Sequence, residues 1–229
     1  MMYLLALTPI AEWLNNTFGA IDLAVATFAN SLHEGALGGF FDLFFKNFTH
    51  LGDEGILFIA LGILLLLFAR TRKGGASMLI ALLFGLLMTN LWLKLLVARP
   101  RPYMNEEVLA FNEFWAAIGH GLESEAGSFP SGHTTSAFAA MFAGFWAFDK
   151  RYSWTGLVFA ALLAFSRIYV QVHYFSDILG GMLVGFVAGT AAFLLMHWLF
   201  TALDRSSAKG ARFISDASLE NVFLKLKKG

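Results

Sequence analysis

Seven ionisable residues lie in or beside strongly apolar stretches of the sequence, where charge is costly. They are four basic residues, two histidines and one aspartate: Lys94, Arg99, Arg101, Arg167, His133, His173 and Asp177. Such a cluster of fixed positive charge predicts an anionic ligand, and the planar guanidinium group of arginine matches pairs of phosphate oxygens. Phosphate suits the cluster better than a carboxylate, which so many donors would over-neutralise. The alternative is that the basic side chains reach toward lipid headgroups.

One histidine and the aspartate have the spacing of a catalytic pair. His173 and Asp177 are four residues apart, so on a helix they share a face. A carboxylate bonded to one imidazole nitrogen fixes the tautomer and leaves the other nitrogen as a base or nucleophile. Such pairs are common and usually structural, and metal binding is the competing functional interpretation. A site that already holds four cationic side chains would repel a divalent ion.

The second histidine follows a helix-start pattern, Pro130-Ser131-Gly132-His133, which opens an apolar run. Pro and Ser favour the first turn of a helix, and Gly lets the backbone approach a ligand closely. The free N–H groups of a helix start bind anions well. Alone the pattern is weak, because a capped helix with an incidental histidine explains it equally well.

The composition shows what kind of protein must position these groups. Hydrophobic residues make up 58% of the 229-residue chain and charged residues 14%, with a mean hydropathy of +0.65. Soluble domains carry about 25% charged residues. The sequence therefore predicts an integral membrane protein and excludes a disordered chain or an ordinary cytosolic enzyme. Basic and acidic residues number 16 each, which argues against nucleic acid as a partner. There is no cysteine, so no disulfide or thiolate metal site is expected.

Five apolar segments approach the length of about 20 residues that a helix needs to cross a bilayer. They are Gly55–Ala69, Gly75–Val97, Phe129–Phe148, Ser153–Val172 and Ile178–Leu203. The interrupted apolar region before Gly55 is either one imperfect span or two helices that lie in the interface. It lacks the basic start and cleavage site of a signal peptide. We expect an all-α fold, a polytopic membrane helix bundle with five to six spanning helices.

Basic residues collect on one side of these expected spans. They follow the first and third spans and fill the C-terminal tail: Arg70, Arg72, Lys73, Lys150, Arg151, Arg205, Lys209, Arg212, Lys225, Lys227 and Lys228. The loop Tyr103–Ser128 carries only acidic charge. The positive-inside rule therefore places the C-terminus in the cytoplasm and this loop outside. All seven ionisable residues then converge on the outer face, where headgroup anchoring by basic residues is disfavoured. The aromatic loop, with Phe111, Phe114, Trp115 and His120, either covers the pocket or forms an interfacial belt.

Three blocks now stand in order along the chain: Lys94-x6-Arg101-Pro102, Pro130-Ser131-Gly132-His133 and Ser166-Arg167-x5-His173-x3-Asp177. Together they resemble the three-part signature of the type 2 phosphatidic acid phosphatase superfamily. The motifs cover residues 94 to 177, and the hydrophobic pattern extends the likeness over about residues 50–203. Order and spacing together make the resemblance specific.

The resemblance implies a role for each matching residue. His173 would be the nucleophile that takes the phosphoryl group, Asp177 would orient it, and His133 would protonate the leaving oxygen and later activate water. The remaining motif residues would bind phosphate: Lys94, Arg101, Ser131, Gly132 and Arg167. No metal or cofactor is implied. Arg99 is outside the motif, and we expect it to be a headgroup anchor rather than a second phosphate contact.

These expectations describe a lipid phosphatase in the cell membrane whose site faces the periplasm or the extracellular side. Residues 1–50 would form N-terminal apolar helices, 51–203 the catalytic transmembrane domain and 204–229 a cytoplasmic basic tail, either solvated or lying on the anionic leaflet. A lipid phosphate is the expected partner. Undecaprenyl pyrophosphate is favoured, and phosphatidylglycerophosphate and phosphatidic acid fit too. A phosphotransferase with the same residues, an anion or lipid transporter and a haloperoxidase are the alternatives; the oligomeric state is not predicted.

Overall fold

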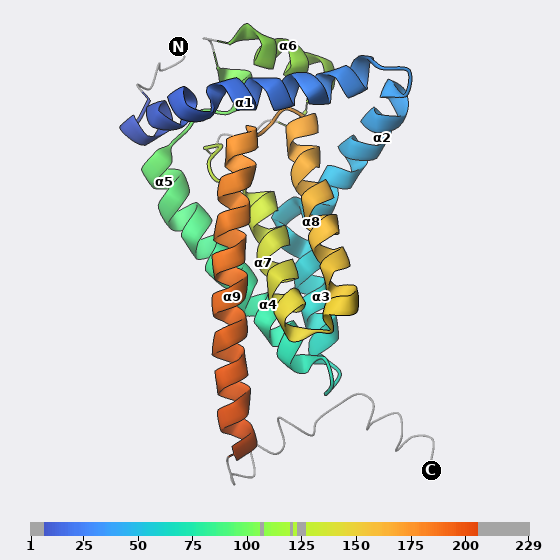
Figure 1. The fold of residues 1–229 in the computed structure, drawn as a ribbon, viewed down its shortest axis with the longest axis vertical. Helices are drawn as coiled ribbons and strands as arrows, with labels where there is room; N and C mark the ends of the chain where they lie inside the picture. Colours follow the sequence, from blue (N-terminus) through green and yellow to red (C-terminus); the bar gives the residue numbers. More distant parts are fainter. Residues whose placement is uncertain (1–6, 106–107, 120, 123–126, 206–229) are drawn as a thin grey trace.

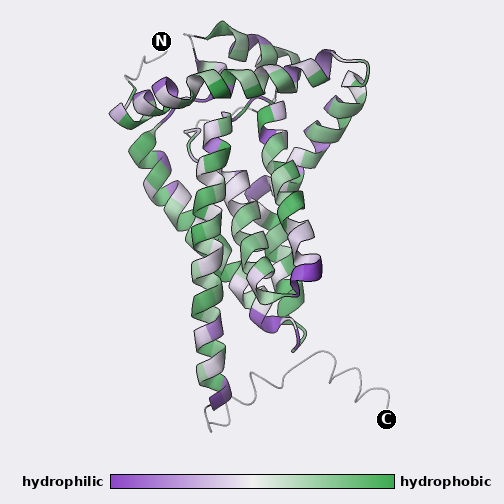
Figure 2. Cartoon of the chain, in the orientation of Figure 1, coloured by the Kyte–Doolittle hydropathy of each residue, from purple (hydrophilic) through white to green (hydrophobic). Residues whose placement is uncertain are grey.

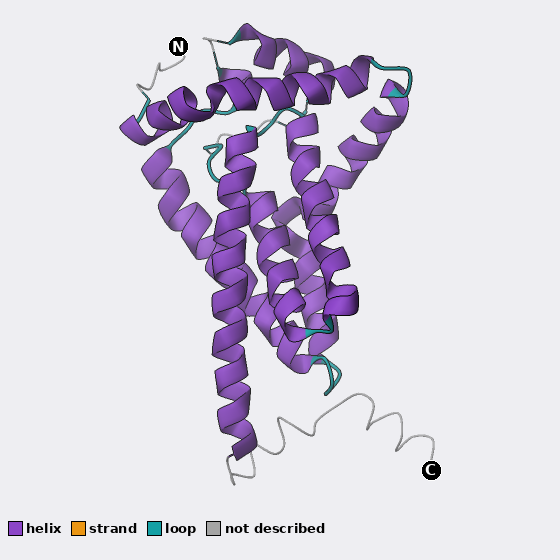
Figure 3. Cartoon of the chain, viewed as in Figure 1, coloured by secondary structure: helices purple, strands orange, loops and turns teal. Residues whose placement is uncertain are grey.

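The computed structural model describes residues 7–105, 108–119, 121–122 and 127–205, and in these parts all the regular structure is helical (Figures 1 and 3). The helices are α1 Pro9–Glu34, α2 Gly38–Phe48, α3 Ile56–Leu66, α4 Arg72–Leu86, α5 Lys94–Val97, α6 Leu109–Ile118, α7 Gly132–Ala147, α8 Lys150–Tyr169 and α9 Phe175–Arg205. Three tighter or wider stretches connect them: the 3-10 helices η1 Thr49–Gly55 and η3 Pro102–Met104, and the π-helix η2 Leu87–Leu93. The predicted all-α class is confirmed. Of the expected C-terminal tail, residues 204 and 205 end α9, and the rest lies outside the described residues.

Within the described residues, three helical stretches are long and apolar enough to cross a membrane: Gly38–Leu66, Arg72–Met104 and Phe175–Arg205. Hydrophobic residues dominate the long helices in Figure 2. Their large apolar side chains point outward, and Trp92 is 76% exposed. Because such a surface is stable only against lipid, the chain is an integral membrane helical protein. The other two expected segments form α7 and α8, of 16 and 20 residues.

The N-terminal region divides into two helices with different orientations. Helix α1 lies across one end of the bundle, as an interfacial helix would, whereas α2 leads down toward α3 and belongs to a candidate span (Figure 1). Thr8 caps α1 by accepting a hydrogen bond from the backbone N–H of Ala11. At the α1–α2 corner, Asp42 accepts a hydrogen bond of 2.7 Å from the Tyr169 hydroxyl and pairs with His33 at 3.0 Å. These contacts fix the corner to α8.

Small residues let the central helix α7 approach α9 closely. Gly181, Gly185 and Gly189 follow one another every fourth residue on the same face of α9. A Cβ atom on Gly185 would lie 2.6 Å from Cβ of Phe138, and one on Gly189 would lie 2.6 Å from the carbonyl oxygen of Ala139. Close backbone packing of this kind is how helices associate in lipid. It brings the start of α7, with His133, beside the start of α9, with Asp177.

The π-helical stretch η2 interrupts the helix that carries Lys94. Inside it the buried Thr89 donates a hydrogen bond of 3.2 Å to the Thr135 hydroxyl of α7. The helix ends at Ala98, whose φ of 46° is left-handed and stops further helical turns. Four apolar residues of this region face outward: Leu91, Trp92, Leu95 and Leu96. Lys94 itself points inward, into the cavity described next.

Candidate active site

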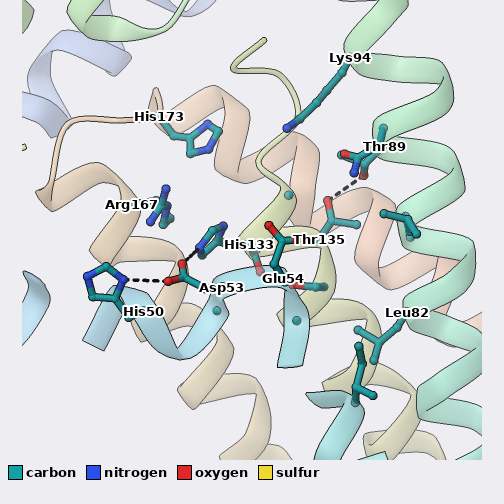
Figure 4. A pocket seen from close by; sticks show the side chains of 18 of the residues that line it. His50, Asp53, Glu54, Leu82, Thr89, Lys94, His133, Thr135, Arg167 and His173 are labelled. Carbon is teal, nitrogen blue, oxygen red and sulfur yellow. Dashed lines mark hydrogen bonds and ion pairs between the residues drawn. The ribbon is translucent and has the colours of Figure 1, made fainter. Parts of the chain in front are cut away.

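A cavity of about 720 Å³ opens among η1, α3, α4, α7 and the C-terminal end of α8. Figure 4 shows its polar end, with Lys94, His133, Arg167 and His173, and the more apolar end, with Leu82. The charged lining consists of Lys94, Arg101, Arg167, His133, His173, His50, Asp53 and Glu54. The apolar lining includes Ile59, Leu79, Leu82, Leu83 and Leu86. The structure therefore brings together the basic residues and histidines of all three sequence motifs.

His173 lies in the turn between α8 and α9 and is held by Asp177. Its Nδ1 is 3.3 Å from Oδ2 of Asp177, which also accepts a hydrogen bond of 2.9 Å from the backbone N–H of Tyr174. The other ring nitrogen, Nε2, makes a long contact of 3.5 Å with a guanidinium nitrogen of Arg101 and is the nitrogen that a substrate would meet. Burial, reinforced by the nearby cations Arg101 and Arg167, holds the pKa of His173 well below its ordinary value. The imidazole is therefore neutral, the form that can act as a nucleophile.

The three basic motif residues are held around the same space. Arg101 donates a hydrogen bond of 3.0 Å to the carbonyl oxygen of Val172, and Arg167 donates one of 2.6 Å to the Thr49 hydroxyl. The buried Nε of Arg167 has no hydrogen-bond partner among the described residues. A Cβ atom at Gly132 would lie 3.9 Å from Nζ of Lys94, so this ammonium sits close to the first turn of α7. Fixed donors in this arrangement suit an anion with several oxygens.

Ser131 and Gly132 have different positions in the structure. The Ser131 side chain is fully buried and caps α7, because its oxygen accepts hydrogen bonds from the N–H and the hydroxyl of Thr134. Gly132 lines the cavity with its backbone. The phosphate contact of the Ser131 hydroxyl therefore stays a prediction, while the backbone at Gly132 is open to a ligand.

Arg99 is not the headgroup anchor that the sequence led us to expect. Its side chain is 1% exposed and donates to Asp177 at 2.8 Å and to Asp22 at 2.9 Å. Further hydrogen bonds go to Ser176 and Asn15, and the guanidinium lies 3.8 Å from the centre of the Tyr174 ring. The expectation was wrong because α1, which supplies Asp22 and Asn15, covers this position. Arg99 supports Asp177 from the side away from His173.

Sequence reasoning missed the residues that precede α3. His133 Nε2 is 2.9 Å from Oδ1 of Asp53, and the other carboxylate oxygen is 2.8 Å from Nδ1 of His50 (Figure 4). Thr49 of the same segment holds Arg167. One signal was available: the acidic pair Asp53-Glu54 directly precedes an apolar span, where charge is costly.

The loop after η3 packs inward rather than forming an aromatic belt. Phe111 of α6 is buried and meets the Tyr174 ring edge-on at 5.2 Å, and Trp115 lies 4.8 Å from the Tyr103 ring. Gly121 and Leu122 reach the cavity and line it. The loop therefore contributes to the cavity wall, as the covering alternative expected. His120 lies outside the described residues.

A neutral, oriented imidazole that faces fixed cations can accept a phosphoryl group, and a second imidazole nearby can exchange protons. The described part of the chain holds no group of three or more His, Cys, Asp or Glu arranged to bind a metal ion.

Comparison with known proteins gives three sequence matches of interest. The family model of the PAP2 superfamily matches residues 74–201. Undecaprenyl-diphosphatase BcrC of Bacillus subtilis is 31% identical over 118 residues, which cover 52% of this chain and 56% of that protein. Lipid A 1-phosphatase of Rhizobium johnstonii is 35% identical over 111 residues, 48% of this chain and 43% of that protein. The chain thus spans about half the length of these curated relatives.

Two solved structures share the fold. LpxE of Aquifex aeolicus superimposes with a TM-score of 0.58 at 25% identity, over 72% of this chain and 92% of that chain. A transmembrane PAP2-type phosphatidylglycerolphosphate phosphatase of Bacillus subtilis superimposes with a TM-score of 0.60 at 23% identity. The match covers 86% of this chain and 92% of that chain. The second match, at this identity, establishes the helical arrangement alone.

Proposed function

Because the chain belongs to the PAP2 superfamily, we propose that it is a membrane phosphatase that removes phosphate from a lipid phosphate or pyrophosphate. One observation carries the proposal: His173, neutral and held by Asp177, shares a cavity with three basic side chains. Those side chains, Lys94, Arg101 and Arg167, would hold the phosphate oxygens and stabilise the charge that develops during transfer. The backbone at Gly132 and the Ser131 hydroxyl are proposed further contacts.

In the first step, Nε2 of His173 attacks phosphorus. The bond from phosphorus to the leaving oxygen breaks, its electron pair stays on that oxygen, and His133 supplies the proton that neutralises it. The product is phosphohistidine, whose Nδ1 proton remains bonded to Asp177.

In the second step, His133, now neutral, takes a proton from water as the water oxygen attacks phosphorus. The nitrogen–phosphorus bond breaks and its electron pair returns to Nε2 of His173, which releases inorganic phosphate. None of these steps needs a metal ion. A lipid hydroxyl in place of water would give phosphotransfer with the same residues.

The shape of the cavity supports a lipid substrate. Its apolar wall consists of side chains from α3 and α4, among them Ile59 and Leu83. A hydrocarbon chain can remain against this wall while the phosphate reaches His173, so the lipid need not leave the membrane. A purely soluble phosphate ester would leave these apolar side chains uncovered.

We favour undecaprenyl diphosphate as the substrate, and the similarity to undecaprenyl-diphosphatase BcrC supports this choice. Lipid A phosphate is the second candidate, since lipid A 1-phosphatase of Rhizobium johnstonii is similar over a comparable length. Phosphatidylglycerophosphate and phosphatidic acid complete the set to be compared. A transporter would use the cations but has no use for a histidine held by a carboxylate.

The proposal includes a membrane topology. Helices α7 and α8 would cross the bilayer with the three candidate spans, which gives five spanning helices and places the cavity at the outer face. Residues 51–203 would be the catalytic unit, and residues 204–229 would be a cytoplasmic tail. The cluster of basic residues at the opposite ends of the helices, including Arg70, Arg72, Lys150 and Arg151, supports this orientation.

Phosphate release by the purified protein in detergent with excess EDTA tests the function. The four lipids and a water-soluble phosphate ester serve as substrates. His173→Ala should abolish release, whereas His197→Ala, an exposed histidine of α9 far from the cavity, should leave it unchanged. Release that EDTA removes, or that survives in the His173 variant, would refute the proposed mechanism.

A further inference from the structure

We propose that Asp53 is a positioning residue for the proton-donating histidine, His133, and that His50 fixes Asp53 in turn. The proposal rests on the proposed function, because it concerns how the leaving oxygen receives its proton. Asp53 and His50 come from η1, which precedes the part of the chain that matches the family model, whereas His133 lies within that part.

The contacts form a chain from the cavity edge to the acid. Oδ1 of Asp53 is 2.9 Å from Nε2 of His133, and Oδ2 is 2.8 Å from Nδ1 of His50. The side chains become more exposed along this chain, from 21% for His133 to 49% for Asp53 and 55% for His50. A carboxylate held at both oxygens has little freedom to turn away from the imidazole.

The backbone of η1 is shaped to receive the imidazole. A Cβ atom at Gly52 would lie 2.6 Å from Cδ2 of His133, so any larger residue would push the ring away. The next residues bend sharply, since Glu54 and Gly55 have φ values of 50° and 68°. This turn places the Asp53 carboxylate beside the ring that Gly52 admits.

The two histidines of the site are held through opposite nitrogens. His173 is held by Asp177 at Nδ1 and presents Nε2, whereas His133 is held by Asp53 at Nε2 and presents Nδ1. One is prepared to attack phosphorus and the other to reach the leaving oxygen. In Figure 4 both rings border the same space, with Asp53 between His133 and His50.

Electrostatics gives Asp53 a second effect. The charged or titratable groups that face His133 across the cavity are Lys94 and Arg101 after the π-helical stretch, Arg167 of α8, His173 of the following turn, and His50, Asp53 and Glu54 of η1. Burial and the cations Arg167 and Arg101 oppose protonation of the imidazole, and Asp53 is the carboxylate in contact with its ring. Without Asp53, His133 carries the proton that the leaving oxygen needs in a smaller fraction of the enzyme molecules.

The proton movements balance. The His133 imidazolium carries a proton on each nitrogen; the Nδ1 proton goes to the leaving oxygen, and the Nε2 proton stays bonded to Asp53. When water attacks in the second step, Nδ1 takes one of its protons and the imidazolium is restored.

The test compares two leaving groups: the alkoxide released from a lipid phosphomonoester such as phosphatidic acid, used here as the lipid substrate, and p-nitrophenolate. The alkoxide is far more basic than p-nitrophenolate and therefore needs a proton more. Asp53→Asn is expected to lower kcat on the lipid substrate by about 10- to 100-fold, part of the 10²- to 10⁴-fold that a positioned acid contributes. Its rate with p-nitrophenyl phosphate should stay within about three-fold of the wild-type rate, because p-nitrophenolate can leave without taking up a proton. His133→Ala should show the same contrast more strongly, and His50→Ala more weakly.

Asp42→Asn is the matched control, since it alters a second His–Asp pair, at the α1–α2 corner away from the cavity. It should leave both rates unchanged. Equal losses of Asp53→Asn on both substrates, or no loss on either, would overturn the assignment while leaving the proposed function intact. A wild-type protein that releases phosphate from neither substrate would instead refute the proposed function.

Discussion

Replacing Arg99 by alanine should destabilise the protein more than the replacement of an exposed residue would. Arg99 is the cation between two buried carboxylates, Asp22 of α1 and Asp177 of α9, which are 1% and 0% exposed. The Arg99→Ala variant leaves both carboxylates buried without that cation. It also removes the hydrogen bonds that Arg99 donates to Ser176 and Asn15.

The size of the effect follows from the burial. Breaking a buried ion pair by removing one partner costs about 3–5 kcal/mol, because the remaining charge is uncompensated. In a chain of this length, 1 kcal/mol corresponds to about 2–4 °C in the melting temperature. The expected decrease is therefore about 6–20 °C. Activity should fall as well, since Arg99 fixes the carboxylate that orients His173.

Thermal unfolding in detergent, followed by the fluorescence of the six tryptophans, measures the decrease. Lys73→Ala is the matched control, because it breaks an ion pair with Asp204 whose side chains are 52% and 47% exposed. Exposed pairs contribute about 0–1 kcal/mol, so this variant should melt within about 4 °C of wild type.

A double variant separates the charge effect from lost packing. Adding Asp22→Asn to Arg99→Ala removes one uncompensated charge and should recover about 0.5–3 kcal/mol. An Arg99→Ala protein that melts like the Lys73 control would refute the assignment of Arg99 as the central cation. A double variant less stable than Arg99→Ala would refute the charge argument.

Four further predictions concern the site and the core. Because the pKa of His173 lies well below 6.5, this proposed nucleophile stays neutral as the pH falls through that value. The acid limb of kcat/KM should therefore have its midpoint below pH 6.5, and a midpoint at or above 6.5 would contradict the environment described. The unfolded chain binds this proton first, so the contribution of His173 to folding stability should also decline below pH 6.5, which unfolding at several pH values would measure. Lys94→Ala, Arg101→Ala and Arg167→Ala should each lower kcat/KM about 10²- to 10³-fold with little change in melting temperature, and near-normal activity in all three would remove the phosphate assignment. Gly185→Leu should destabilise the α7–α9 contact by about 1–3 kcal/mol or more, because the added atoms meet Phe138; unchanged melting would contradict the packing described.

The sequence predicted those parts of the molecule that depend on local pattern. All five apolar segments form helices, and the motif residues Lys94, Arg101, His133, Arg167 and His173 line one cavity. Hydropathy identifies the apolar segments. Ionisable residues within them are energetically costly, and this marks them as candidates for a binding site.

What the sequence could not show depends on how distant segments meet. Arg99 was expected to face headgroups, since nothing in its neighbourhood indicates that α1 folds over it with Asp22. Asp53 was overlooked because its partner, His133, is 80 residues away. Both contacts are made by segments outside residues 94–177, the range of the three motifs, so motif spacing carries no information about them.

The π-helical stretch η2 has a consequence for chain length. A π-helical turn holds one residue more than an α-helical turn, so it absorbs an insertion without rotating the helix that follows. Deleting Leu91, which faces outward, would let the stretch close into ordinary α-helix while Lys94 still points into the cavity. The same deletion made within α4 would turn Lys94 by about 100°, toward lipid. The helix therefore tolerates a change in length at one place, and that place lies directly before Lys94.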